Sequence, residues 1–162
     1  MVDEIILKPI GIIHTPFKEP QGTPIQPTGA CDIEGTVEIF PGYADGLQDV
    51  EGFSHLFLLF YCHLTGEHSL LVKPFLDDTL RGVFATRSPR RPNPIGLSIV
   101  RLMSRERNLL HILDVDMVDG TPLLDIKPYI PDVDTREADR IGWLEKRVGE
   151  ISKKRDDGRF SA

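Results

Sequence analysis

The clearest alternation of hydrophobic and polar residues lies between Asp32 and Phe40. The apolar members share one side of an extended chain: Ile33, Val37 and Ile39. The other side carries only polar or charged residues: Asp32, Glu34, Thr36 and Glu38. A period of two is typical of a half-buried strand. Phe53 to His63 is rich in Phe and Leu instead, which predicts a buried strand that crosses the core.

Further short strands are predicted along the rest of the chain. Ile5 to Thr15 is rich in β-branched residues, but Pro9 confines it to a sheet edge or a bulge. Pro16 to Ala30 contains four prolines and reads as an ordered or ligand-covering loop. Five more strands are separated by Pro, Gly or charged turns: Leu70–Val72, Gly82–Ala85, Ile95–Met103, Leu109–Val115 and Leu123–Ile130. Ser104 to Asn108 should join two of them as a hairpin. So many short strands indicate a mainly β fold, and we expect a barrel rather than a sandwich.

Helical patterns are few. Tyr43 to Val50 predicts one or two short turns, and Arg136 to Lys154 has helical spacing. The apolar residues of the latter segment fall on one stripe: Ile141, Leu144, Val148 and Ile151. We therefore expect a barrel domain over residues 1–135, followed over 136–162 by a C-terminal helix and a frayed polar tail of the same domain. The helix also offers a subunit contact.

A chain of 162 residues is long enough for one core without crosslinks. Cys31 and Cys62 form no CxxC pair, which favours a reducing compartment. The start of the chain lacks the features of a signal peptide, and the longest apolar run, Leu56 to Tyr61, is far too short for a membrane helix. We expect a cytoplasmic protein that does not engage a membrane.

The charge of the chain is unevenly distributed. Its net charge is −6, yet Arg81 to Arg107 holds seven arginines and one acid. Because the guanidinium group is a planar fork of donors suited to phosphate or carboxylate, this block indicates a local anion site. The alternative is a solvated surface.

Thr86 to Gly96, TRSPRRPNPIG, lies within this block. Three prolines fix φ at their own positions and bias the residues before them towards extended geometry. A stiff backbone presents Arg87, Arg90 and Arg91 with little loss of conformational freedom on binding. We predict that this loop is central to function.

Asp114 to Thr121, DVDMVDGT, is the second candidate site. Asp119-Gly120 signals a turn that gathers carboxylates where a strand ends. The turn is open to three interpretations: a divalent-metal loop, a site for a cationic or hydroxyl-bearing ligand, or a plain hairpin. The spacing of a calcium loop is absent, and the histidines lack zinc-site spacing, so we expect no metal. No hydrolase or Rossmann motif is present.

The segments GVFATRSPRRPNPIGLSIVRL, DMVDGTPLLDIKPYIP, EGFSHLFLLFYCH and IGIIHTPF closely resemble the TrmO family, also called TsaA-like or YaeB-like proteins. The resemblance covers roughly Ile10 to Asp132. It implies a single-sheeted β-barrel that acts as a homodimer and uses S-adenosylmethionine to methylate tRNA. The acceptor would be the exocyclic N6 amine of threonylcarbamoyl-adenosine, just 3′ of the anticodon in a threonine tRNA.

The resemblance also implies roles for particular residues. It assigns contacts with S-adenosylmethionine to Pro27, Thr28, Gly66, Glu67, Arg91, Leu102, Asp116, Met117, Val118, Asp119 and Gly120. The cationic sulfonium and ammonium groups of this cofactor favour Asp116 and Asp119. Asp125, Lys127 and Tyr129 alternate along one predicted strand and are the candidates for binding or deprotonating the acceptor adenosine. Arg81, Arg87 and Arg90 remain for tRNA phosphates or the threonyl carboxylate.

Two other functions remain open at this point. One is a non-catalytic barrel that binds a nucleotide or RNA anion through the arginine loop. The other is a metal-dependent hydrolase that uses the histidines and the aspartate turn. The chain also has little sequence after the barrel motifs, whereas longer relatives carry a further C-terminal domain, so the choice of tRNA is not settled by the resemblance.

Overall fold

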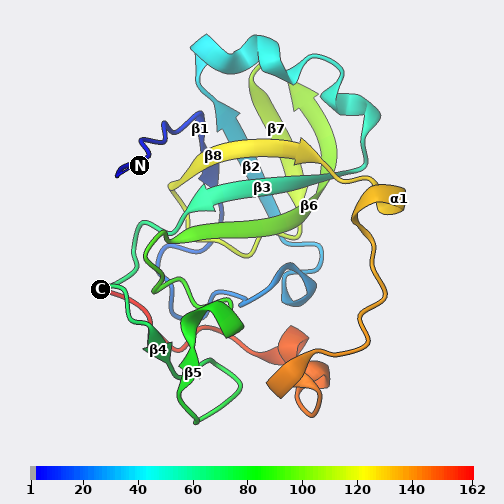
Figure 1. Ribbon diagram of the computed structural model, residues 1–162. Helices are drawn as coiled ribbons and strands as arrows, with labels where there is room; N and C mark the ends of the chain where they lie inside the picture. The colour runs from blue at the N-terminus through cyan, green and yellow to red at the C-terminus, as the bar shows by residue number, and fades with distance from the viewer. Residues whose placement is uncertain (1–2) are drawn as a thin grey trace.

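Six antiparallel strands close into a barrel in the computed structural model, which describes residues 3–162 (Figure 1). Their order around the barrel is β1-β2-β7-β6-β3-β8. The strands span Gly11–His14 (β1), Glu34–Ile39 (β2), His55–Tyr61 (β3), Ile95–Glu106 (β6), Leu109–Leu113 (β7) and Thr121–Pro128 (β8). The predicted mainly β barrel is confirmed.

Alternation along the strands decides which side chains fill the barrel. In β3, Leu56, Leu58 and Phe60 are buried, while the residues between them face outward. The same rule buries Val37 and Ile39 in β2, as the sequence predicts. The barrel core gathers one such residue or more from every strand: Ile13, Val37, Ile39, Leu56, Leu58, Phe60, Val100, Leu110, Ile112 and Leu123.

One glycine is required by this packing. Gly96 in β6 pairs with Phe60 of β3, and a Cβ on Gly96 would lie 2.1 Å from the Phe60 ring. The ring therefore occupies the space that a side chain would need. Glycine at this position lets Phe60 close one end of the barrel.

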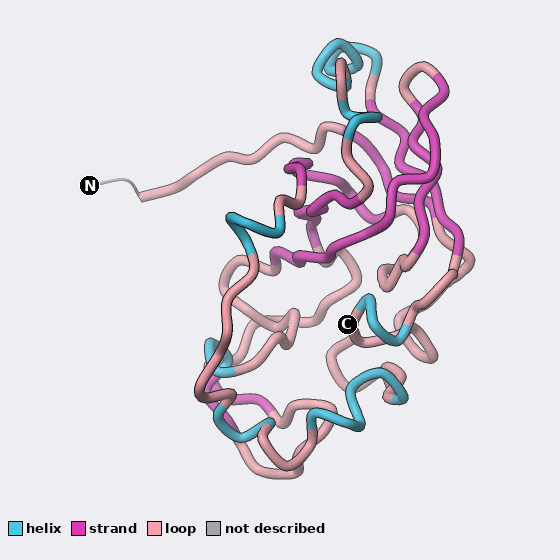
Figure 2. The backbone as a smooth tube through the Cα atoms, turned by 90° about the vertical axis from the view of Figure 1, so that its right-hand side faces the viewer, coloured by secondary structure: helices cyan, strands magenta, loops and turns pink. Residues whose placement is uncertain are grey.

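Beneath the barrel lie residues 16–32, 62–94 and 137–162, which we call the loop layer (Figures 1 and 2). It contains the short hairpin of β4 (Leu71–Val72) and β5 (Arg81–Gly82). Its 3-10 turns are η1 (Pro27–Gly29), η4 (Val83–Ala85), η5 (Gly142–Leu144) and η6 (Val148–Lys153). Two more, η2 (Pro41–Leu47) and η3 (Val50–Gly52), join β2 to β3, where short helical turns are predicted. None of the helices between residues 3 and 162 has the length and apolar character needed to cross a membrane.

Several predicted strand boundaries are wrong. The N-terminal strand begins at Gly11 rather than Ile5, and Ile5 and Ile6 are largely exposed. Pro9 explains this, since it cannot donate to a ladder just before the strand. Val83–Ala85 forms a 3-10 turn instead of continuing β5. The predicted hairpin of β6 and β7 is confirmed, but β6 runs to Glu106 and pairs there with Leu109, with Arg107 in a left-handed conformation.

The predicted helix over Arg136 to Lys154 is also wrong. Only the two 3-10 turns η5 and η6 form there, and among the described residues α1 (Pro131–Asp134) is the single α-helix. Gly142 has φ of +62°, which a right-handed helix does not allow, and Gly149 lies within the second turn. The four apolar residues therefore do not share one buried face: Ile141 and Val148 are exposed, whereas Leu144 and Ile151 line a cavity.

The polar C-terminal tail is ordered, contrary to the prediction that it frays. Phe160 is 5% exposed and packs with Val72 and Val83, and its ring lies edge-on to Phe75. Ser161 forms a β-bridge with Thr65. The buried Phe160 ring and backbone hydrogen bonds between the tail and Gly22, Thr23 and Leu64 hold a segment whose composition is otherwise polar.

Candidate active site

A cavity of about 400 Å³ opens at the end of the barrel that faces the loop layer. We call it the mouth cavity. Strand residues that point into the barrel form part of its wall, among them Phe60, Ser98 and Thr121. The rest comes from the loop layer and includes Gln26, Thr65, Arg87, Arg91 and Phe160, and from the turn after β7, which supplies Asp116, Met117 and Val118.

A second cavity of about 1000 Å³ lies against the outside of the barrel. We call it the outer cavity. Its barrel wall consists of outward-facing residues of β3 and β6, namely His55, Phe57, Leu97 and Ile99. The loop layer supplies the opposite wall, including Pro27, Thr28, Phe84 and Trp143. The two cavities share a wall that contains Ile25, Gln26, Phe75, Thr86, Arg87, Leu97, Ser98 and Phe160.

The arginine loop is folded by its own polar groups. Arg91 Nη1 donates to the carbonyl oxygens of Thr86 at 2.8 Å and Ser88 at 3.1 Å. The backbone amide of Ser88 donates to Thr86 Oγ1, and that of Arg90 donates to Ser88 Oγ. The loop is therefore held by internal hydrogen bonds as well as by proline, and Arg91 has a structural role.

The other two arginines of the loop point to different neighbours. Arg87 Nη1 donates to Gln26 Oε1 at 2.7 Å, and this pair lies in the wall that the two cavities share. Arg90 Nε donates to the carbonyl oxygen of Glu67 at 2.7 Å, which ties the loop to residues 66 and 67. Arg87 is thus the arginine that faces both cavities.

Asp116 is the buried acid of the mouth cavity. It accepts a hydrogen bond of 2.6 Å from Ser98 Oγ. The residue retains some accessible surface, but its carboxyl group lies deep among protein atoms. This burial raises the pKa of Asp116 to about 7, against the opposing effects of Ser98 and of the Arg87 charge. Burial therefore destabilises the charged form of Asp116, and a cationic ligand in the mouth cavity would stabilise that form.

Cys62 lies beside this acid in the mouth cavity. Burial raises the pKa of its thiol to about 11, and the charge of Asp116 acts in the same direction. A thiol of this kind stays protonated at neutral pH, so Cys62 is not an activated nucleophile.

The three aspartates of the turn do not converge on one point. Asp119 accepts from Lys18 Nζ at 2.7 Å and from the amide of Thr15 at 3.0 Å, and the Lys18 hydrogen bond lowers its pKa. Asp114 accepts from the amide of Asp32 at 2.9 Å. Each carboxylate has its own partners, so the three do not form one common set of ligands.

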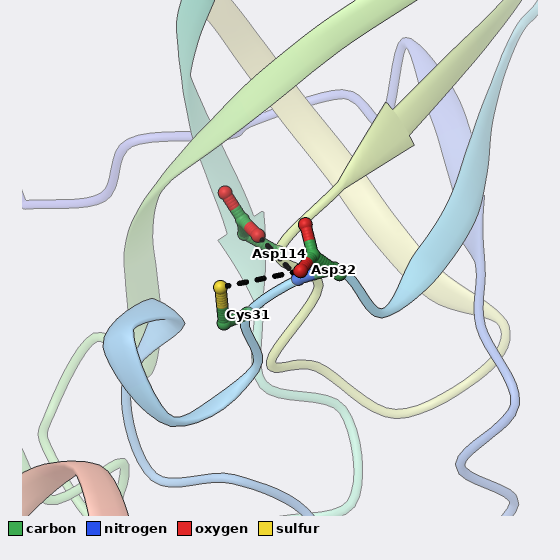
Figure 3. A group of neighbouring side chains, drawn as sticks. All are labelled: Cys31, Asp32 and Asp114. Carbon is green, nitrogen blue, oxygen red and sulfur yellow. Dashed lines mark hydrogen bonds between the residues drawn. The ribbon is translucent and has the colours of Figure 1, made fainter.

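Asp114 does lie in another close group, with Cys31 and Asp32 (Figure 3). Cys31 Sγ donates to Asp32 Oδ2 at 3.7 Å, and the Asp32 charge raises the pKa of Cys31. Asp32 and Asp114 both have left-handed φ angles, and the hydrogen bond between them joins two tight turns. These contacts account for the group as a structural junction.

The family model described as "tRNA-methyltransferase O N-terminal domain" matches residues 12–135. The chain belongs to this family.

Individual TrmO relatives agree. A probable S-adenosyl-L-methionine-binding protein of Pyrococcus abyssi is 59% identical over 96% of this chain and 85% of its own length. The tRNA (adenine(37)-N6)-methyltransferase of Escherichia coli is 42% identical over 75% of this chain, which spans 56% of that protein. The crystal structure of TrmO from Pseudomonas aeruginosa superposes with a TM-score of 0.74 at 38% identity, covering 89% of this chain and 63% of that one.

The residues that the TrmO resemblance assigns to the methyl donor do not all line the same cavity. Arg91, Asp116, Met117 and Val118 line the mouth cavity, whereas Pro27 and Thr28 line the outer cavity. Gly66 and Glu67 follow the cavity residue Thr65 without lining either cavity. Asp119 and Gly120 lie one step further along the turn, and Gly120 adopts φ of +78°. Leu102 packs on the barrel core four residues beyond Ser98 and lines neither cavity.

Two of the residues predicted to act on the adenosine, Asp125 and Lys127, lie in β8, and Tyr129 directly follows this strand. Lys127 Nζ lies 3.0 Å from Asp125 Oδ2, so these two form an ion pair. The Tyr129 ring lies edge-on to Phe57 at 5.5 Å and to His55 at 6.3 Å. Since Phe57 and His55 line the outer cavity, Tyr129 lies next to its wall, but none of the three residues lines either cavity.

Arg81 lies further out in the loop layer. Its guanidinium binds Asp77 Oδ2 at 2.6 Å and lies over the Trp143 ring at 5.9 Å. Trp143 in turn donates from Nε1 to the carbonyl of Ala85 at 2.8 Å.

Sequence reasoning did not single out Gln26, Ser98, Trp143 or Phe160, although all four line at least one cavity. Ser98 had a signal, since it is a polar residue at an inward position of an apolar strand. The lone tryptophan and the lone aromatic residue of a polar tail were signals of the same kind.

Proposed function

We propose that this protein transfers a methyl group from S-adenosylmethionine to the N6 position of adenosine 37 in tRNA. One observation carries the proposal: the mouth cavity brings Arg91 of the arginine loop together with Asp116, Met117 and Val118 of the aspartate turn. Two segments separated in sequence thereby form one site. Its volume of about 400 Å³ suits a single small molecule. The names of the relatives support both the donor and the acceptor.

The residues of the mouth cavity fit a cationic donor. The Asp116 carboxyl is held by Ser98 and has no cation bonded to it, so a sulfonium or ammonium group would stabilise its charged form. S-adenosylmethionine supplies an electrophilic methyl group, which leaves a neutral thioether behind when the N6 lone pair takes the methyl carbon and N6 releases a proton. The protein contributes alignment of the two reactants, which is the main requirement of such a displacement.

We further propose the specific acceptor, threonylcarbamoyl-adenosine of a threonine tRNA, and a homodimer that acts in the cytoplasm. The guanidinium of Arg87 in the shared wall suits the threonyl carboxylate. Asp125, Lys127 and Tyr129 would position the acceptor or receive its proton. Exposed Leu70, Leu71 and Leu80 around the β4–β5 hairpin support a subunit contact.

Donor binding tests the mouth cavity directly. We expect Asp116→Asn to weaken S-adenosylmethionine binding by roughly tenfold or more in titration calorimetry, because a charge-assisted contact is lost. Asp132→Asn in α1 is the matched control and should bind as the wild type does. Arg91→Ala is less informative, since it also removes two hydrogen bonds that fold the loop. Absence of donor binding by the wild-type protein would favour a non-catalytic RNA-binding barrel.

The acceptor is tested by mass spectrometry of tRNA nucleosides. Cells that lack this protein should lose the methylated form of threonylcarbamoyl-adenosine, and the purified protein should restore it. Persistence of that nucleoside in the deletion strain would contradict the proposed acceptor. Methylation of a different adenosine would retain the enzyme class and change the substrate.

A further inference from the structure

The outer cavity has more than twice the volume of the mouth cavity and a different chemistry. Aromatic rings approach it from several elements: Phe57 of β3, Phe84 of η4 and Trp143 of η5, with the His55 imidazole beside them. Apolar side chains such as Ile99 and Leu144 fill the spaces between. Flat apolar surfaces that accept a ring between them are the usual means of holding an unstacked nucleobase.

Cationic side chains lie near these rings, and two of them are in ion pairs. Arg81, which binds Asp77, lies over Trp143. Lys127, which is paired with Asp125, lies opposite Phe57 in the β3–β8 ladder. Arg87 lies in the shared wall and donates to Gln26. A guanidinium at this position suits a phosphate that flanks the base.

The shared wall fixes the relation between the two cavities. Gln26, Arg87 and Ser98 line both, so the two cavities adjoin at these side chains. Ser98 also holds Asp116, the acid that faces the mouth cavity. Transfer requires N6 to contact the methyl carbon directly, so the two ligands would meet where the cavities adjoin.

We propose that the outer cavity holds the acceptor adenosine, taken out of the anticodon-loop stack, with its base against Phe57 and Trp143 and its reactive edge towards the Gln26–Arg87 wall. This inference rests on the proposed methyltransferase function. An enzyme that modifies a base must extract it from its neighbours, and the extraction needs a pocket of this kind. The contact of the Tyr129 ring with Phe57 and His55 of the cavity wall agrees with it.

Fluorescence tests the inference in the wild-type protein, because Trp143 is the single tryptophan of the chain. The protein is first saturated with S-adenosylhomocysteine, and an anticodon stem-loop RNA is then added. We expect little change in the first step. The second should lower Trp143 emission by roughly twofold or more, since a stacked base quenches an indole. The matched control is the same RNA with an abasic site in place of the acceptor adenosine, which should bind without quenching.

Three results would overturn the inference. Equal quenching by S-adenosylhomocysteine alone would place the donor in the outer cavity. Equal quenching by the abasic RNA would leave the base outside it. A change that depends on protein concentration without RNA would show that a second copy of the chain covers the cavity. The fluorescence experiment measures binding and needs no methyl transfer. A failure of this inference can therefore be told apart from a failure of the proposed methyltransferase function, which an activity assay measures.

A filled cavity gives an independent test. Ile99 lines the outer cavity only, so Ile99→Phe should raise the KM for tRNA by roughly tenfold while the Kd for S-adenosylmethionine stays within about twofold. Met103→Phe, further along the outward side of β6, is the matched control. Thermal melting of both variants establishes that they fold. Equal loss of donor binding, or an unchanged KM in folded Ile99→Phe, would contradict the assignment.

Discussion

The buried carboxyl group of Asp116 affects both the stability of the fold and the binding of a cationic ligand. Its carboxyl group is buried beside Ser98, with Arg87 as the nearby positive charge and Cys62 as a neutral neighbour. Burial favours the protonated form, whereas a bound cation favours the charged form. The same group therefore links the pH, the stability of the protein and the occupancy of the mouth cavity.

Stability should depend on pH through Asp116. Its pKa rises from an ordinary value of 3.8 to about 7 on folding, so between these values the folded protein binds more protons and its stability falls as pH rises. Asp116→Asn removes this dependence. From pH 5 to pH 8 the variant should gain roughly 2–3 kcal/mol relative to the wild type, at 1.36 kcal/mol per pKa unit. Urea unfolding at several pH values measures the difference, and a constant difference would contradict it.

At the scale of elements, the barrel was the more predictable part of the fold. Alternation in β2 and the apolar run of β3 are local signals, and both strands form where they indicate. The segment after α1 was not predictable in this way, because its helical stripe competes with Gly142 at positive φ. The outer cavity was hidden for a related reason: Trp143 and Phe57 are far apart in sequence and line the same cavity only because of tertiary packing. The arginine loop and the aspartate turn could be recognised as motifs, but the hydrogen-bond partners of their individual side chains could not be predicted from the sequence.

The contact of β3 with β6 yields a prediction at this scale. In Gly96→Ala the new Cβ would lie 2.1 Å from the Phe60 ring, so the ring or the strand must move. We expect a loss of about 1–3 kcal/mol of unfolding free energy, as for other overpacked cores. Gly52→Ala, where the structure has open space, is the control and should change stability by less than about 0.5 kcal/mol. Denaturant unfolding of both variants compares them, and similar values would refute the packing argument.

At the scale of the molecule, the C-terminal tail packs against several other segments of the loop layer. Phe160 packs with Val72 and Val83, and Val83 donates to the carbonyl of Leu70. The same side chain lies in the wall between the two cavities. The tail thus supports both cavities although it lies outside the barrel.

Removal of this anchor should loosen the loop layer selectively. In Phe160→Ala we expect faster amide hydrogen exchange at Val72 and Val83, with little change in the β3–β6 ladder, because the small cluster around Phe160 is separate from the barrel core. Lys153→Ala, at an exposed position nearby, is the control. Exchange measured by mass spectrometry distinguishes the outcomes. Equal acceleration in the barrel strands would mean that the layer and the barrel unfold as one unit.

The closure of the barrel also determines when its strands can pair during translation. β1 pairs on one side with β8, and Gly11 lies opposite Leu123. A ribosome that has made β1 must therefore complete most of the chain before this partner exists, and the loop-closure entropy of so distant a pairing slows folding. Until β8 emerges, β1 and β3 each present an unpaired edge. The nascent chain is consequently most exposed to aggregation just before its last strand appears.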